Sequence, residues 1–138
     1  MSSKSIGEIM NEVSDTVGKK AKADVLRANN TTVLVKFLAE LNNDTPWAWE
    51  DRKLPNINHT EDSPEGMQEN TIAMELRRLY LFRAGAVDPK KQDELLCQFV
   101  ESLSKIEMEI IVAMVQGKKL PVKGLTSKFI ADLFDGKI

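Results

Sequence analysis

The feature that most constrains the fold is a set of apolar residues spaced three and four apart along most of the chain, in several places preceded by a helix-start signal. A Ser three residues before a Glu has the spacing of a capping box, and a polar cap before a Pro marks the first helical residue. The signals are, in chain order, Ser5 with Glu8, Ser63-Pro64, Asp88-Pro89, Ser104 with Glu107, and Thr126. Because the apolar spacing matches the helical period of about 3.6 residues, the regular parts of the chain are predicted to be helical.

These signals predict up to seven helices. Five cover residues 5–17, 19–28, 31–41, 63–85 and 88–103; the sixth runs from Ser104 to Gly117, and the seventh from Thr126 to Gly136. No segment alternates between polar and apolar residues as a strand does, and no solenoid repeat is present. We expect an all-α fold, a compact irregular orthogonal bundle of about six to seven helices, as a single domain over residues 1–138.

Residues 44–62 are predicted to form one long ordered loop. They contain Pro46, Pro55 and both tryptophans, and they show neither the helical nor the strand period. Trp47 and Trp49 stand two apart around Ala48, so they cannot share one face of a helix, but they could flank an extended segment. One interpretation is that both pack inward and anchor the loop; the other is that one is exposed and marks a partner site.

Composition excludes several classes of protein. The 138 residues are enough for one core, and 42% apolar with 29% charged residues is typical of a folded globule. The net charge of −2 gives no overall attraction to nucleic acid. The longest apolar run, residues 110–115, is too short to cross a membrane, and the polar start of the chain lacks the apolar core of a secretory signal. We expect a protein of the cytoplasm that does not bind membranes.

The residues that carry chemistry do not form a recognisable catalytic or metal site. His59 is the only histidine, and no neighbour positions it as a base; the single cysteine, Cys97, stands among apolar residues, the setting of an unreactive thiol. One Cys and one His cannot form a zinc site, the acidic residues after His59 lack calcium-loop spacing, and no glycine-rich phosphate loop is present. We expect no enzyme, no metal and no cofactor; the alternative is an enzyme that uses carboxylates of residues 61–75.

Two groups of residues are candidates for binding a partner. Arg77 and Arg78 stand beside Tyr80, a mixture enriched at protein interfaces and nucleic-acid surfaces; the alternative is that one arginine forms an internal ion pair. The second group lies in a window free of acidic residues around a predicted helix start, where lysines and backbone amides together favour phosphate. Its members are Lys118, Lys119, Lys123 and Lys128. The alternative for these lysines is a solvated connector.

Three motifs resemble a family of small proteins of unknown function from large T-even-like tailed phages, including cyanophages. They are residues 63–67 (SPEGM), 75–82 (ELRRLYLF) and 118–126 (KKLPVKGLT), and residues 23–30 also fit. The resemblance covers most of the chain, with two departures: Val122 replaces an expected tyrosine, and residues 133–136 replace a more usual Ala-Phe-Pro-Gly ending. It implies a phage protein of the host cytoplasm and supplies no catalytic residues.

Two hypotheses for function follow. The first is a noncatalytic phage accessory protein that binds a phage or host protein during infection, through Arg77, Arg78 and Tyr80 with Trp47 and Trp49 of the loop. The second is a nucleic-acid-binding protein that uses the four C-terminal lysines, whose binding would weaken steeply with salt. The oligomeric state is left open.

Overall fold

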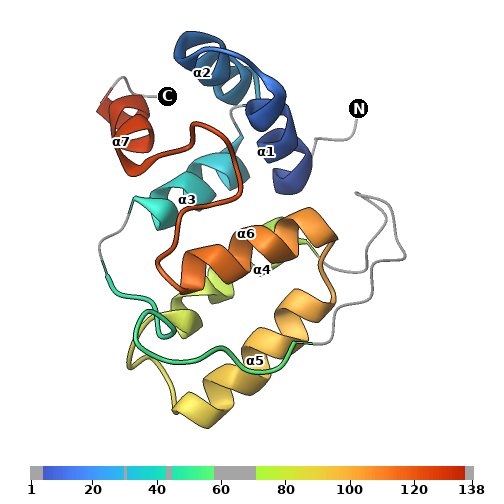
Figure 1. Ribbon diagram of the computed structural model, residues 1–138, viewed down its shortest axis with the longest axis vertical. Helices are drawn as coiled ribbons and strands as arrows, with labels where there is room; N and C mark the ends of the chain where they lie inside the picture. The colour runs from blue at the N-terminus through green and yellow to red at the C-terminus, as the bar shows by residue number, and fades with distance from the viewer. Residues whose placement is uncertain (1–4, 30, 43–44, 58–70, 136–138) are drawn as a thin grey trace.

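The computed structural model describes residues 5–29, 31–42, 45–57 and 71–135, and within these ranges it is all-α (Figure 1). Its helices are α1 (Ile6–Asp15), α2 (Lys19–Ala28), α3 (Thr32–Leu41), α4 (Ile72–Glu75), a 3₁₀ helix η1 (Leu76–Phe82), α5 (Pro89–Glu101), α6 (Lys105–Val115) and α7 (Ser127–Asp135). No β-strand occurs in the described ranges, where one isolated bridge pairs Trp47 with Arg83. The predicted fold class is confirmed.

Several helices begin at the caps that the sequence predicts. Ser5 and Glu8 form a complete capping box, with the backbone nitrogen of Glu8 donating to Ser5 Oγ (3.1 Å) and that of Ser5 donating to Glu8 Oε1 (3.0 Å). The backbone nitrogen of Phe129 donates to Thr126 Oγ1 (3.1 Å) at the start of α7. These bonds satisfy amide groups that have no partner within their own helix, so the caps fix where each helix starts.

Glu107 has a larger role than its predicted place in a capping box. Its backbone nitrogen donates to Ser104 Oγ (3.3 Å), as expected, but its buried carboxylate accepts from the backbone nitrogens of Gly7 and Ile72, each at 2.9 Å. Gly7 and Ile72 belong to the first turns of α1 and α4, where free amides favour a negative charge. One carboxylate of α6 therefore caps two other helices and joins them to α6.

The predicted helix over residues 63–85 is wrong in two respects. Its expected start at Ser63-Pro64 lies outside the described residues, but Thr71 is extended (φ −140°, ψ 161°), so no continuous helix runs through it. Thr71 Oγ1 accepts from the backbone nitrogen of Met74 (3.2 Å), which starts a new helix at Ile72. After Glu75 the chain tightens into η1, with three residues per turn instead of 3.6.

Two other helices are shorter than predicted. α1 ends at Asp15, with Thr16 extended as its C-cap, and Val17 is 92% exposed instead of packing inward. α5 ends at Glu101, two residues before the expected Leu103, and Leu103 is buried in the connection to α6. In both cases the apolar period continues past the end of the hydrogen-bonded helix, so the period alone does not place the helix end.

The core lies around α6. In Figure 1, α1, α2 and α7 lie at one end of the molecule and α5 at the other, with α6 between them. α6 is apolar on most of its circumference, as expected of a helix enclosed by neighbours, and Ile110, Ile111, Met114 and Val115 are buried. The buried cluster includes residues of every named helix. None of the described helices is long and apolar enough to cross a membrane.

Candidate functional site

The η1 segment presents a row of exposed side chains. Residues three apart lie above one another in a 3₁₀ helix, so its side chains form three rows along its length. Met74, at the end of α4, Arg77 and Tyr80 form the row that faces solvent; Met74 is 67% exposed, Tyr80 is 60% exposed, and Arg77 is exposed as well. We call these three residues the exposed row. The sequence pattern does not indicate Met74 as a surface residue, because an α-helical period over residues 63–85 turns that position inward.

The opposite row of η1 fixes the segment to the core. Leu79 and Phe82 are buried and Leu76 is partly buried. The Phe82 ring stacks on Phe99 of α5, with centroids 5.7 Å apart and planes 3° from parallel, and it contacts Trp49 at a tilt, 6.0 Å between centroids. Leu76, Leu79 and Phe82 are spaced three apart, and this regular spacing is the signal in the sequence that indicates a 3₁₀ helix and not an α-helix.

The third row of η1 lines a small hollow against α5. The hollow has a volume of about 100 Å³. One side is formed by Arg78 and Leu81 of η1 and by Glu75, the residue before η1, and the other side by Leu95 and further residues of α5. Arg78 Nε lies 3.5 Å from Glu75 Oε2, and the arginine is largely exposed. Such an exposed pair adds little stability, so the guanidinium group is accessible to a partner. Among the described residues, Arg78 thus has one exposed ion pair, with Glu75, and Arg77 has none.

Trp47 is buried, and its partner is an arginine that sequence analysis did not single out. The Arg83 guanidinium lies over the Trp47 ring, 3.5 Å from its centroid, and Trp47 is only 7% exposed. Arg83 also donates to Glu40 Oε2 (2.7 Å), to Glu40 O (3.0 Å) and to Thr45 O (2.6 Å). All these contacts join α3, the loop and the end of η1, so the cation here supports the fold.

Trp49 is held in the same manner on α5. Its Nε1 donates to Asp93 Oδ1 (2.9 Å), and Arg52 lies over its ring at 5.0 Å while donating to the same carboxylate oxygen (3.1 Å). Trp49 is 2% exposed. Both tryptophans thus anchor the loop, and neither contributes exposed surface to the predicted protein-binding site, which is left with Arg77, Arg78 and Tyr80 and gains Met74.

The four lysines of the second candidate site are all exposed, but they do not line one hollow. Lys118 and Lys119 line a hollow of about 420 Å³ that also includes Thr126. Lys123 and Lys128 do not line it, and the backbone nitrogen of Lys123 donates to Ser14 Oγ of α1 (3.1 Å). None of the four lysines forms an ion pair with a described residue.

The chemistry-bearing residues give no catalytic constellation in the described part of the chain. No group of three His, Cys, Asp or Glu residues there could hold a metal ion. His59 and the acidic residues 61, 62 and 65 lie outside the described residues. Cys97 is partly buried, with its Sγ 3.6 Å from Asn56 O, and burial raises the pKa of the thiol, with smaller contributions from Glu101 and Asp93. A raised pKa disfavours the nucleophilic thiolate.

Comparison with known proteins gives no relative. No protein-family model matches the chain, and no curated protein and no solved structure is significantly similar to it. The resemblance to the phage family therefore stays a prediction from the motifs.

Proposed function

We propose that this protein is a noncatalytic accessory protein that binds a phage or host protein during infection, and that the contact surface is the exposed row with Arg78 beside it. One observation carries the proposal: Met74, Arg77 and Tyr80 face solvent together from one short segment. Met, Arg and Tyr are enriched in protein interfaces, and Tyr and Arg are prominent among the residues that contribute most to binding.

The rigidity of the segment supports the same proposal. The backbone nitrogen of Ala48 donates to Phe82 O (2.9 Å), and that of Ala84 donates to Pro46 O (2.9 Å), so the loop holds the end of η1. The row opposite the exposed one is packed into the core. A surface whose backbone is already fixed loses less conformational freedom on binding, which leaves more of the contact energy as affinity.

The charges and shape of the surface indicate the chemistry of the partner. Arg77 forms no ion pair with a described residue, and Arg78 has only its exposed pair with Glu75. A carboxylate of the partner would meet unpaired or weakly paired guanidinium groups, which bind carboxylates through two parallel hydrogen bonds. An apolar side chain of the partner would pack on Met74 and Tyr80 or enter the 100 Å³ hollow beside Arg78. The resemblance to the phage family supplies the setting.

The test is affinity capture from an extract of infected cells with three forms of the tagged protein, with and without nuclease. The forms are wild type, the double variant Arg77→Glu with Tyr80→Ser, and the control Lys90→Glu, which reverses an exposed charge on α5. We expect a nuclease-resistant partner that wild type and control retain and that the double variant loses by about thirtyfold or more, the size of effect typical of residues that dominate an interface. A partner that binds all three forms equally would contradict this surface.

Direct nucleic-acid binding is the alternative. The observation that favours it is that Lys118, Lys119, Lys123 and Lys128 are exposed and form no ion pair with a described residue. Nuclease treatment would then remove the captured proteins. Binding to single-stranded or duplex oligonucleotides would weaken steeply between low and physiological salt, because each neutralised phosphate releases a counterion. Lys→Glu changes at these four positions would abolish it, and salt-independent binding would exclude it.

A further inference from the structure

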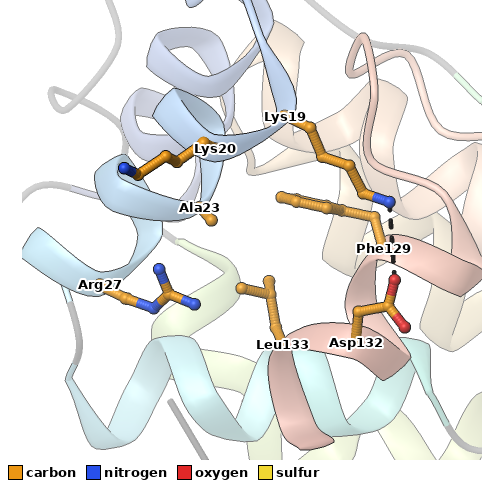
Figure 2. A pocket seen from close by; sticks show the side chains of 7 residues that line it. All are labelled: Lys19, Lys20, Ala23, Arg27, Phe129, Asp132 and Leu133. Carbon is orange, nitrogen blue, oxygen red and sulfur yellow. Dashed lines mark ion pairs between the residues drawn. The ribbon is translucent and has the colours of Figure 1, made fainter. Parts of the chain in front are cut away.

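A second hollow lies between α2 and α7, away from the exposed row. Its volume is about 370 Å³, within the range of roughly 300–1,000 Å³ found for small-molecule sites. Its floor is apolar: in Figure 2, Phe129 and Leu133 of α7 point toward Ala23 of α2, and all three residues are largely buried. Their small exposed faces and the aliphatic stems of the lysines and the arginine around them form the lining on which an apolar body would leave water.

Charged residues stand around this floor, and most of them are positive. Lys19, Lys20 and Arg27 line the hollow with only one carboxylate, Asp132. Lys19 Nζ lies 3.6 Å from Asp132 Oδ2, and this ion pair stands beside Phe129 at one end of the hollow (Figure 2). Lys19 thus shares its end of the hollow with a carboxylate that also lines it, whereas Lys20 forms no ion pair with a described residue.

Arg27 stands at the other end, next to Leu133 (Figure 2). Its Nη1 lies 3.6 Å from Asp24 Oδ1, and both side chains are more than half exposed. An ion pair of that length and exposure contributes little to stability, so Asp24 does not prevent the guanidinium group from binding a ligand. The two ends of the hollow therefore differ. Its apolar floor leads to the planar guanidinium group of Arg27, which can bind a carboxylate through two hydrogen bonds.

We propose that this hollow binds a small amphipathic carboxylate, with the aliphatic chain on Phe129, Leu133 and Ala23 and the carboxylate on Arg27. The site is independent of the protein-binding surface on η1. A cationic amphiphile would place its charge against Arg27 and Lys20 and be repelled. A neutral alcohol of the same length would keep the apolar contact and lose the charge-assisted hydrogen bonds. Inorganic phosphate would meet the cation but gain nothing from the apolar floor.

The experiment is an NMR titration of the labelled protein with octanoate, 1-octanol and octylammonium, below the concentrations at which they form micelles. Octanoate is expected to shift the backbone amide signals of residues 19–27 and 129–133 in a saturable manner. Its dissociation constant is expected to be about tenfold or more below those of the alcohol and the ammonium compound, as the loss of hydrogen bonds to a charged group predicts. Equal binding of the three compounds, shifts that map elsewhere, or no saturable shift would overturn the proposal.

Two variants and one control test the two halves of the site. Arg27→Gln removes the cation from an exposed position, so the fold is kept, and it should weaken octanoate binding about tenfold and leave 1-octanol binding unchanged. Ala23→Leu fills the floor and should abolish binding of both compounds. Lys90→Gln removes one exposed cation of α5, the helix that lies at the other end of the molecule from α2 and α7 (Figure 1), and should change neither. If Arg27→Gln and Lys90→Gln behave alike, or if Ala23→Leu is folded by its NMR spectrum and still binds octanoate as wild type does, the site is not the one proposed.

Discussion

The tryptophan loop, residues 45–57, and the exposed row combine arginine with apolar and aromatic side chains and use them in opposite ways. In the loop, each tryptophan ring is covered by an arginine whose guanidinium also binds a carboxylate, Glu40 for Arg83 and Asp93 for Arg52. In the exposed row, Arg77 stands between Met74 and Tyr80 with no ion pair to a described residue. The difference shows what decides whether an arginine beside an aromatic ring supports the fold or is free to bind a partner.

A buried guanidinium must place its donors on acceptors, because an unpaired charge away from water is strongly unfavourable. Arg83 and Arg52 Nη2 find acceptors on α3, on α5 and on the loop backbone, whereas Arg52 Nε is buried without a described hydrogen-bond partner. The contacts of both arginines are thus made within the fold. In the exposed row, Arg77 forms no ion pair with a described residue, and because it is exposed, water can accept from its donors. Substitutions in the loop should therefore lower stability, and substitutions in the row should affect only binding.

The largest effect is expected for Trp49→Ala. The indole is almost completely buried and contacts Phe82, and its loss leaves a large cavity between the loop and α5. We expect the free energy of unfolding to fall by about 3–5 kcal/mol, measured by urea denaturation. Trp49→Phe keeps an aromatic ring, loses the hydrogen bond to Asp93 and should fall between wild type and the alanine variant. A loss below about 1 kcal/mol for Trp49→Ala would show that the loop is not anchored there.

Arg83→Ala is expected to have the next largest effect. It removes donors to Glu40 and to two backbone carbonyls and uncovers the Trp47 ring. Loss of one partner of a buried pair is usually worth more, but Glu40 is partly exposed and water can replace part of the contact, so we expect a loss of about 2–3 kcal/mol. Urea denaturation of Arg83→Ala, Glu40→Ala and the double variant measures the coupling. Additive effects of the two single changes would contradict a direct pair.

A smaller effect is expected at Cys97 of α5, whose thiol contacts the loop at Asn56 and can be used to probe that contact. Burial is the main cause of its raised pKa, and Glu101 and Asp93 add to it. The folded state therefore prefers the protonated thiol: this contribution to stability is present below the pKa of the unfolded chain and is lost as the pH rises through the folded value. At about pH 8, iodoacetamide should react several-fold more slowly with the folded protein than with the urea-unfolded chain, since only the thiolate attacks.

The difference in rate should narrow as the pH rises, because the folded thiol then ionises. Glu101→Gln removes a nearby negative charge and should speed the reaction at about pH 8. Trp49→Phe, which loosens the loop beside Asn56, should also speed it. A reaction as fast in the folded protein as in urea would mean that the thiol is freely accessible and that its pKa is not raised.

Much of the fold was predictable because its signals are local. Caps such as Ser5 with Glu8 depend on residues three apart, and the apolar period identifies the inward face of each helix whatever it packs against. Glu107 shows the limit: its spacing predicts a bond to its own helix start, but its carboxylate reaches Gly7 and Ile72, which are distant in sequence. No local pattern specifies those partners, since tertiary packing alone brings them together.

The candidate site was predictable only in part for the same reason. Arg77, Arg78 and Tyr80 stand out by residue type. Met74 lies in α4, and it falls into one row with Arg77 and Tyr80 because the chain tightens to three residues per turn after Glu75. Whether Trp47 and Trp49 are exposed depends on Arg83 and Arg52, whose positions next to the rings follow from the path of the loop. The hollow at Arg27 requires α2 and α7 to meet, although residues 19–27 and 129–133 lie at opposite ends of the chain.

The smallest effect on stability is expected for the exposed row itself, in the double variant Arg77→Ala with Tyr80→Ala. Both side chains face water and Arg77 pairs with no described carboxylate, so the free energy of unfolding should stay within about 0.5 kcal/mol of wild type. Urea denaturation of this double variant and of Trp49→Ala under the same conditions compares the free energies of unfolding of the two regions directly. A loss of about 2 kcal/mol or more would mean that the row is covered in solution, so that Arg77 and Tyr80 support the fold as the arginines and tryptophans at the loop do. A stable variant that has lost its partner would separate the two regions. Arginine beside an aromatic ring would then stabilise the fold at the loop, where carboxylates and carbonyls accept its hydrogen bonds, and would bind a partner in the exposed row, where it faces water.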